Sequence, residues 1–383
     1  MTMSEKELQP RWSNYFFCKG DEFRFWKEYL SNSERNVLYV LGLGFDPRMC
    51  HGLRAMSEVG GSGKRDCIVI EFDEGPSSPS MMYSSLIEAN KRTLENVFHG
   101  GNKTFKKVSM WSNDHRRIGS RTAASVFPSL DDFASYSDIV IDVSAMPRGI
   151  YFPLIGKILY LIDSSSKLSV SAKSLNLHVL VSENAQLDSR INDEGIDEDA
   201  SYMYGFTGAL DTESASGSPK VWIPILGEKQ AQQLERIYNL VLPDEICPML
   251  PMPSVDPRRT NNLLVEYREL LFDRLRVDQR NFIYVAEQNP FEVYRELHRT
   301  IIHYNKALKT LGGCQIVISA LASKLLSIGA LLAAYELKDY GSGVGIAHVE
   351  TQGYHFESGG DMEKQLSRTD LSTLWLAGDC YGR

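Results

Sequence analysis

Short, continuous apolar runs separated by helix-like segments constrain the fold of this chain more than any other feature of its sequence. The runs over 37–43, 67–72 and 138–143 read VLYVLGL, CIVIEF and DIVIDV. Apolar runs without polar alternation are typical of strands that helices cover on both faces. Because such strands alternate with helical segments, the sequence predicts an α/β protein with mainly parallel, doubly wound sheets.

The alternation of strands and helices occurs twice, so we expect two Rossmann-like lobes. A length of 383 residues fits two domains of ordinary size. The N-terminal lobe is expected over 1–210, with a short helical extension at its start, and the C-terminal lobe over 220–359. The Ser- and Gly-rich segment 211–219 is expected to be a linker, and residues 360–383 a polar tail.

Charge and cysteine usage argue against several classes of function. A net charge of -8 disfavours non-specific binding to nucleic acid or to anionic membranes. The six cysteines have neither zinc-like spacing nor the pattern of a disulfide framework, so we expect no metal site and a reducing, cytoplasmic location. The first residues lack a signal-peptide core. The apolar run over 316–335 contains Lys324 and three serines, which favours a strand and a buried helix over a membrane span.

The strongest binding motif lies in that same run. A strand over 316–319 leads into a small-residue turn and then a helix. Such a turn places backbone N–H groups and the positive end of a helix at the carboxyl edge of a sheet. Ser319, Ser323 and Lys324 add hydroxyls and a cation. These groups predict a phosphate site, and therefore a nucleotide-like ligand whose identity the sequence does not specify.

Polar side chains also follow two strands of the N-terminal lobe. In the turn Gly-Phe-Asp-Pro-Arg, Asp46 and Arg48 either face a ligand or serve locally, with Asp46 capping the next helix. Glu71 and Asp73 end the next strand. Acids at that place bind ribose hydroxyls in many nucleotide-binding folds, although acids are also common wherever a strand returns to solvent.

Two further loops complete the expected site residues. Asp142 ends an apolar strand, and a buried carboxylate needs a partner, which we expect to be Arg148 or Arg48. Alternatively, Asp142 and Ser144 face the cleft. Asn289 precedes a helix as its cap and also lies at a cleft edge. The five loops expected at the carboxyl edges of the sheets are 44–48, 71–75, 142–148, 287–291 and 319–324.

The C-terminal third resembles a known family. Residues 316–324 with the helix over 325–334, the strand over 344–349 and Tyr354 resemble the closing unit of CRISPR-associated Rossmann-fold (CARF) sensor domains. The turn in that family is usually Gly-Gly-Thr-Lys, whereas this chain has Leu-Ala-Ser-Lys over 321–324 and lacks both glycines. The resemblance implies that this turn contacts a cyclic nucleotide. The layout is also similar to two-lobed bacterial proteins of uncharacterised activity from phage-defence gene clusters.

Three functions remain open at this point. The first is a sensor or subunit of a defence complex, which binds a nucleotide-like ligand and either a protein partner or a second copy of itself. The second is an enzyme acting on a nucleotide, either an S-adenosylmethionine-dependent methyltransferase or a glycosidic-bond hydrolase, favoured by 42–46 together with Glu71 and Asp73. The third is an interaction subunit with a decayed site. The turn that carries Lys324 favours the first.

Overall fold

The computed structural model describes residues 9–75, 78–114, 116–166, 174–208, 210, 217–357 and 362–381. It divides into two compact units. Unit 1 comprises residues 1–14 and 196–350, and unit 2 comprises residues 15–195 and 351–383. The chain therefore passes between the units three times. The expected α/β class, with two mainly parallel doubly wound sheets, is confirmed.

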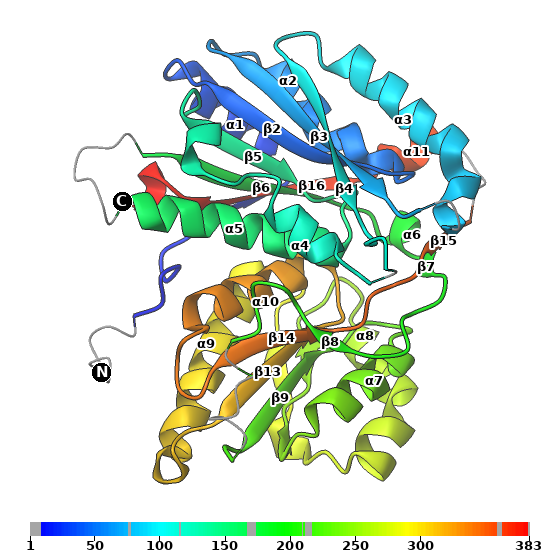
Figure 1. Cartoon of the computed structure of the whole chain (residues 1–383), viewed down its shortest axis with the longest axis vertical. Coiled ribbons are helices and arrows are strands. Elements are labelled where there is room, and N and C mark those ends of the chain that lie inside the picture. Colours follow the sequence, from blue (N-terminus) through cyan, green and yellow to red (C-terminus); the bar gives the residue numbers. More distant parts are fainter. Residues whose placement is uncertain are drawn as a thin grey trace. The chain divides into compact units, whose positions relative to one another are not determined.

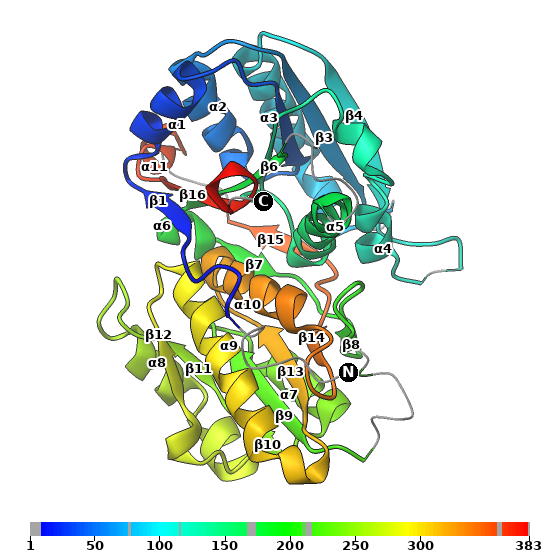
Figure 2. The same ribbon diagram turned by 90° about the vertical axis from the view of Figure 1, so that its left-hand side faces the viewer.

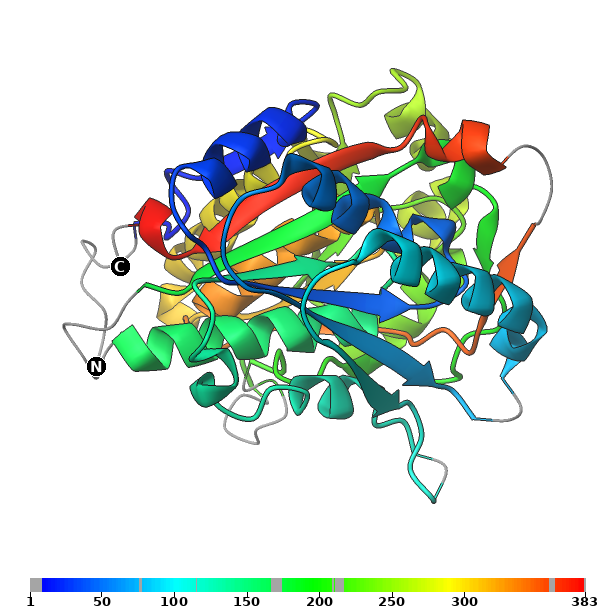
Figure 3. The same ribbon diagram turned by 90° about the horizontal axis from the view of Figure 1, so that it is seen from above.

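Unit 2 contains a seven-stranded sheet in the order β1-β16-β6-β5-β2-β3-β4. Its five parallel strands are β2 (Val37–Leu43), β3 (Arg65–Asp73), β4 (Lys103–Ser109), β5 (Asp138–Asp142) and β6 (Asn176–Glu183). The strand β16 (Asp370–Ala377) pairs antiparallel with β6, and β1 (Phe16–Lys19) pairs antiparallel with β16; in Figure 3 the red strand is β16. The direction of winding reverses between β2 and β5, which makes this pair the switch point of the sheet.

Helices cover both faces of the unit 2 sheet. Figure 1 shows α2 (His51–Val59) and α3 (Ser84–Val97) on one face and α4 (Gly119–Ala124) and α5 (Arg148–Ser166) on the other. This double cover explains why β2 and β5 consist of buried residues along their whole length. The remaining helices of the unit are α1 (Glu22–Ser31), α6 (Ala185–Asp188) and α11 (Met362–Leu366). The short strands β7 (Ile191–Asp193) and β15 (Tyr354–Phe356) pair antiparallel.

Unit 1 repeats the same winding. Its strand order is β12-β11-β9-β13-β14-β8, with β10 (Glu245–Ile246) beside β9. The parallel strands are β9 (Lys220–Ile225), β11 (Met249–Pro251), β12 (Ile283–Val285), β13 (Gln315–Ala320) and β14 (Val344–His348); β8 (Ser201–Tyr202) is antiparallel to β14. The switch point lies between β9 and β13.

The helices of unit 1 follow from this winding. Figure 2 shows α9 (Pro290–Ala307) beside α10 (Lys324–Leu337), whereas α7 (Ala231–Val241) and α8 (Arg259–Glu266) cover the opposite face. A Cβ atom at Gly329 of α10 would lie 2.4 Å from the carbonyl oxygen of Pro290. The glycine therefore allows α10 to pack closely on α9. A π-helix over Glu269–Arg274 follows α8.

The structure differs from the expected domain organisation in three places. Residues 360–383 are not a polar tail, because they contain β16, whose pairing with β6 and β1 places it inside the unit 2 sheet. The proline-rich segment 243–257, whose prolines predict an irregular course, contains the strands β10 and β11. The chain crosses from unit 2 to unit 1 at 195–196 and not at the expected linker, of which residues 211–216 lie outside the described residues. Among the residues described, no helix is long and apolar enough to cross a membrane.

Candidate functional site

The loops after β9 and β13 touch each other at the switch point of unit 1. The N–H of Leu321 donates to the carbonyl oxygen of Ile225 at 3.0 Å. A Cβ atom at Gly227 would lie 2.2 Å from the carbonyl oxygen of Leu321 and 3.0 Å from the Cα of Ala322. Only a glycine permits this approach of two backbones. Open α/β sheets bind ligands outside the carboxyl ends of the strands at a switch point, so this contact marks the candidate site of unit 1.

A turn over Gly227–Gln230 forms one side of this site. The hydroxyl of Tyr267, a buried residue that follows α8, donates to the carbonyl oxygen of Gly227 at 2.5 Å and accepts the N–H of Gln230 at 2.9 Å. It therefore takes the place of the hydrogen bond that normally closes such a turn. The backbone N–H of Lys229 donates to Glu266 at 2.6 Å. Tyr267 and Glu266 fix the turn, while Glu228 and Lys229 are exposed at its apex.

The start of α10 forms the other side. Ser323 is the N-cap of the helix, and its hydroxyl accepts the N–H of Leu326 at 3.4 Å. Lys324 is the first helical residue and is partly exposed. Ser319 differs from these two, because it is fully buried and its hydroxyl accepts the indole N–H of Trp222 at 2.9 Å. Of the three residues predicted here, Ser323 and Lys324 lie at the site and Ser319 lies in the core beneath it.

An ion-pair network lies on the same sheet edge. Arg259, at the start of α8, bonds Glu228 at 2.8 Å and also pairs with the buried Glu287. Glu287 follows β12 and also accepts the N–H of Val255 at 3.0 Å. Asn289 caps α9 by accepting the N–H of Phe291 at 3.0 Å, as expected for its capping role. The network joins the loops after β9, β11 and β12, which gives the site a rigid border.

In unit 2, the predicted loop after β2 is fixed by its own charges. Arg48 is 2% exposed and bonds both carboxylate oxygens of Asp46, at 3.0 and 2.8 Å. It also bonds Asp188 at 2.7 Å. Asn90 of α3 donates to the carbonyl oxygens of Gly44 and Asp46 at 2.8 and 2.9 Å. Asp46 and Arg48 therefore fix the conformation of the loop, and Asp46 also caps the helical turn that follows. Of the two roles expected for them, ligand contact or local structure, these bonds correspond to the local one.

The loop after β5 lies beside the loop after β2. A Cβ atom at Gly44 would lie 3.7 Å from the carbonyl oxygen of Ala145. Asp142 is buried as expected, and its carboxylate accepts the N–H of Ser144 at 2.9 Å. The hydroxyl of Ser144, in turn, accepts the N–H of Ser182 at 2.8 Å. Arg148 begins α5, and its pairing with Asp142 stays a prediction.

The two acids at the end of β3 have different surroundings. Asp73 pairs with Lys107 at 2.8 Å, and this bond holds the pKa of the carboxyl below its ordinary value. Glu71 is partly exposed and lies opposite Leu43 of β2, one strand away from the loop after β2. Within the described ranges it has no hydrogen-bond or ion-pair partner. Of these two acids, Glu71 is therefore the one that remains able to bind a ligand hydroxyl, although its charge also acts on Lys107, its neighbour on β4.

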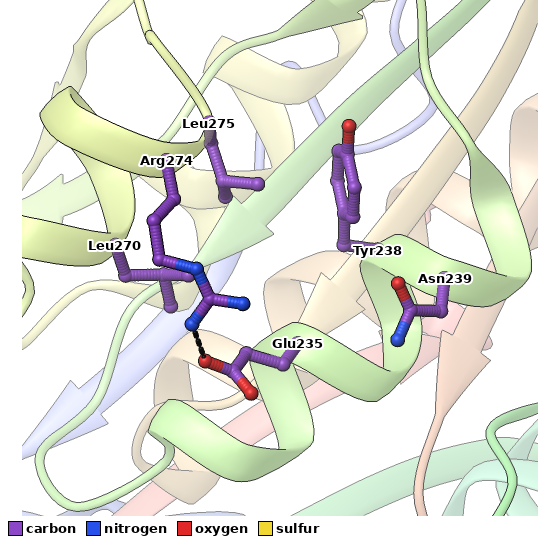
Figure 4. Close-up of a pocket in the computed structure, with 6 residues that line it drawn as sticks. All are labelled: Glu235, Tyr238, Asn239, Leu270, Arg274 and Leu275. Atoms are coloured by element: carbon purple, nitrogen blue, oxygen red, sulfur yellow. Dashed lines mark hydrogen bonds and ion pairs between the residues drawn. The ribbon is translucent and has the colours of Figure 1, made fainter.

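Each unit has one recorded hollow among the described residues, and the hollow of unit 2 adjoins the loop after β2. One, of about 130 Å³, lies between α7 and the π-helix of unit 1, where Glu235 and Arg274 form an ion pair beside Tyr238 (Figure 4). The other, of about 250 Å³, lies between α2 and α3 of unit 2, and His51 and Arg54 contribute to its lining. Burial, and then the neighbouring Arg54, lowers the pKa of His51. Phe45 and Pro47 of the predicted loop 44–48 line the hollow of unit 2, although the predicted site residues Asp46 and Arg48 do not.

A buried polar cluster at the opposite, amino end of the unit 2 sheet was not predicted. Asp138 begins β5 and accepts hydrogen bonds from Tyr29 and Ser137, both at 2.6 Å. His178 of β6 and Arg35 each approach it at 3.4 Å. Burial opposes the charge of Asp138, but these hydrogen bonds outweigh it and lower its pKa. Burial also lowers the pKa of His178. The amino end of a parallel sheet is not its ligand edge, so we assign this cluster to stability.

Among the described residues, no group of three or more His, Cys, Asp and Glu side chains is placed to hold a metal ion.

Comparisons with known proteins add little to this description. No protein-family model and no curated protein matches the chain. Among solved structures, the chain is similar to an uncharacterised protein from Mycobacterium paratuberculosis, with 10% identity, coverage of 80% of this chain and 76% of that chain, and a TM-score of 0.21. A likeness this distant carries no argument about function.

Proposed function

We propose that this protein binds a nucleotide, or a related phosphorylated ligand, at the switch point of unit 1, and that it acts as a sensor or subunit of a prokaryotic antiphage defence complex. The observation that carries the proposal is the contact of Gly227 with the backbone of Leu321 and Ala322. It joins a glycine turn to the N-terminus of α10 at the sheet edge where doubly wound folds bind their ligands.

The resemblance to CARF sensor domains supports the same assignment. In unit 1, β13 leads through Leu321–Ser323 into α10 and then β14. This is the strand, turn and helix order on which the resemblance rests. Tyr354 is an exception, because it lies in β15 of unit 2. The defence role and a protein partner or second copy rest on the resemblance alone. The cytoplasmic location is part of the proposal because all six cysteines are free.

The test is a thermal-shift panel of mono-, di- and cyclic nucleotides, followed by calorimetry of whichever nucleotide stabilises the protein. Removing the cation with Lys324→Ala is expected to cost about 1.5–3 kcal/mol of binding free energy. Lys309→Ala is the matched control, because Lys309 is exposed between α9 and β13, at the amino edge of the same sheet. Equal affinity of the two variants would argue against the site.

A second candidate function is favoured by Glu71. An acid near the carboxyl end of the second parallel strand, one strand away from the Gly44 loop, is arranged as in folds that bind the ribose of a nucleoside or of S-adenosylmethionine. This candidate corresponds to the enzyme alternative. It requires unit 2 to bind S-adenosylmethionine or S-adenosylhomocysteine, and Glu71→Gln to weaken that binding. If neither compound at millimolar concentration raises the melting temperature, the methyltransferase is excluded.

A further inference from the structure

The hollow of unit 2 has the size of a site for a small molecule. It lies between α2 and α3, next to the loop after β2, and its volume is about 250 Å³. An apolar cavity of about 150 Å³ holds benzene, so this hollow has room for one aromatic ring with a short arm, or for two fused rings. Sites for larger, drug-sized ligands have about 300–1,000 Å³. The expected ligand is therefore smaller than a nucleotide.

One part of the lining is apolar and contains a fixed aromatic wall. The ring centroid of Phe45 lies 4.9 Å from that of Tyr83 and 5.9 Å from that of Phe356. Tyr83 and Phe356 are buried, and the hydroxyl of Tyr83 accepts the N–H of Phe356 at 2.7 Å. Aromatic rings attract one another at centroid distances of about 4.5–7 Å, so this wall favours a flat aromatic ligand. The apolar lining residues are Phe45, Pro47, Leu86, Ala89, Phe356 and Leu366.

The other part of the lining is polar and carries one formal charge. Its residues are Cys50, His51, Arg54, Asn90 and Thr93. Burial, and then the charge of Arg54, holds the pKa of His51 below its ordinary value of 6.5, and burial raises the pKa of Cys50 to about 12. Both side chains are therefore uncharged at neutral pH. Among the described lining residues, Arg54 is then the cation, and no carboxylate opposes it.

The guanidinium of Arg54 is not used within the described part of unit 2. It forms no ion pair there, although Glu58 lies one helical turn later on α2. The hollow of unit 1 differs in this respect, because its Arg274 pairs with Glu235 (Figure 4). A single cation beside an apolar wall, with no acid in the lining, complements a ligand that has an apolar body and one negative charge.

Asn90 adds a hydrogen-bond acceptor to the same hollow. It is 8% exposed, and its amide N–H groups both donate to carbonyl oxygens of the loop after β2, at 2.8 and 2.9 Å. These two bonds fix the orientation of the amide. Its oxygen accepts no hydrogen bond from any residue that the structure describes, and it is not sealed from solvent. A donor on a ligand in the hollow would satisfy this oxygen.

We infer that the hollow of unit 2 binds a small aromatic monocarboxylate whose ring carries an N–H or O–H group. The ring packs against Phe45 and Phe356, the carboxylate pairs with Arg54, and the ring donor bonds the oxygen of Asn90. One guanidinium matches the single charge of a carboxylate, whereas a phosphate dianion would retain an unpaired charge. This site is independent of the proposed nucleotide site, so either can fail without the other.

Calorimetry of the full chain with indole-3-acetate tests the inference. A ligand of this size is expected to bind in the micromolar to millimolar range. Arg54→Gln should weaken binding about tenfold or more, because it removes a charge-assisted contact. Indole-3-acetamide, which has no charge, should bind more weakly than the acid and equally to both proteins. Arg92→Gln is the matched control: Arg92 is an exposed residue of α3 outside the lining, and the affinity should stay within about twofold of wild type.

Two further comparisons locate the ligand. Ala89 is an exposed lining residue, so the large side chain of Ala89→Trp should occupy the hollow and abolish binding of indole-3-acetate. Glu95→Trp, at an exposed position of α3 outside the lining, should bind as the wild type does. In 1-benzothiophene-3-acetate sulfur replaces the ring N–H, and its affinity should be about threefold lower or less because the bond to Asn90 is lost.

Several results would overturn the inference. The first is no binding of indole-3-acetate at millimolar concentration. The second is equal affinity of the wild type for the acid and its amide, or for the acid and 1-benzothiophene-3-acetate. The third is wild-type affinity in Arg54→Gln or in folded Ala89→Trp. If Ala89→Trp does not fold, Arg54→Gln decides alone, because Arg54 is exposed and its substitution leaves the packing intact. The fourth is tighter binding of hexanoate than of indole-3-acetate, which would exclude an aromatic ligand.

Discussion

Gly227→Ala tests the contact that defines the site of unit 1. The new Cβ atom would lie 2.2 Å from the carbonyl oxygen of Leu321. Carbon and oxygen atoms rarely approach closer than about 3.3 Å, so the two loops must separate by roughly 1 Å. Both neighbours of the new atom are backbone, which cannot rotate away as a side chain can. The φ of Gly227 is not in the left-handed region, so the cost of the substitution is steric.

The expected loss of stability follows from two opposing effects. Overpacking of this kind costs about 1–3 kcal/mol. Replacing glycine by alanine also lowers the conformational entropy of the unfolded chain, which stabilises the folded state by about 0.4–1 kcal/mol. The free energy of unfolding should therefore fall by about 1–2 kcal/mol, and the melting temperature of the transition that includes unit 1 by about 2–8 °C. Nucleotide affinity should fall as well, because the groups on the two loops move apart.

Thermal and urea unfolding of the full chain measure this loss, and calorimetry measures the affinity. Gly217→Ala is the matched control, because a Cβ atom there meets nothing within 4 Å and the stability should change by less than about 0.5 kcal/mol. If Gly227→Ala is as stable as Gly217→Ala and binds nucleotide as the wild type does, the loops do not meet as described, and the reasoning that places a ligand between them fails.

Two further predictions concern unit 2. The pKa of His178 in the folded state lies below its ordinary value of 6.5, so the unfolded state binds more protons and the free energy of unfolding should fall as the pH drops below about 6.5. The pKa of Asp138 is also lowered, so a further loss of stability is expected below its ordinary value of 3.8. Urea titrations at pH 7 and 5 should show that the free energy of unfolding depends less on pH in His178→Gln than in the wild type. The exposed control His303→Gln should behave as the wild type does. A pH dependence of stability that is unchanged in His178→Gln would contradict the assignment. Arg48→Met should cost about 3–5 kcal/mol of stability by leaving the buried Asp46 without its partner. Asp46→Asn in the same chain should recover part of that loss, and a double variant no more stable than Arg48→Met would contradict a role of this pair in fixing the loop.

Local sequence patterns were sufficient for the strands with continuous apolar runs. The runs over 37–43, 67–72 and 138–143 correspond to β2, β3 and β5, because strands that helices cover on both faces need apolar residues at most positions. The loops that follow them lie at carboxyl edges as expected, since that position follows from parallel winding alone.

Contacts between distant parts of the chain could not be predicted in this way. The strand β16 is buried because it pairs with β6, nearly two hundred residues earlier. The apolar run over 374–377 was nevertheless a usable signal for a strand. The bridging of Gly227 and Gln230 by Tyr267 also depends on a helix that returns from another loop. The sequence identified the turn at Ser323 and Lys324 because that turn follows directly from a strand and a helix. It did not identify Gly227 and Lys229, because their turn is held by contacts with residues about forty positions later.

Hydrogen exchange with and without the best-binding nucleotide of the panel tests the central claim most directly. The account predicts slower exchange of the backbone amides over 226–230 and 321–326, the two sides of the unit 1 switch point. Protection confined to 44–48 and 142–148 would move the ligand to unit 2. No protection of either pair of loops, at a nucleotide concentration that saturates the calorimetric signal, would contradict the account.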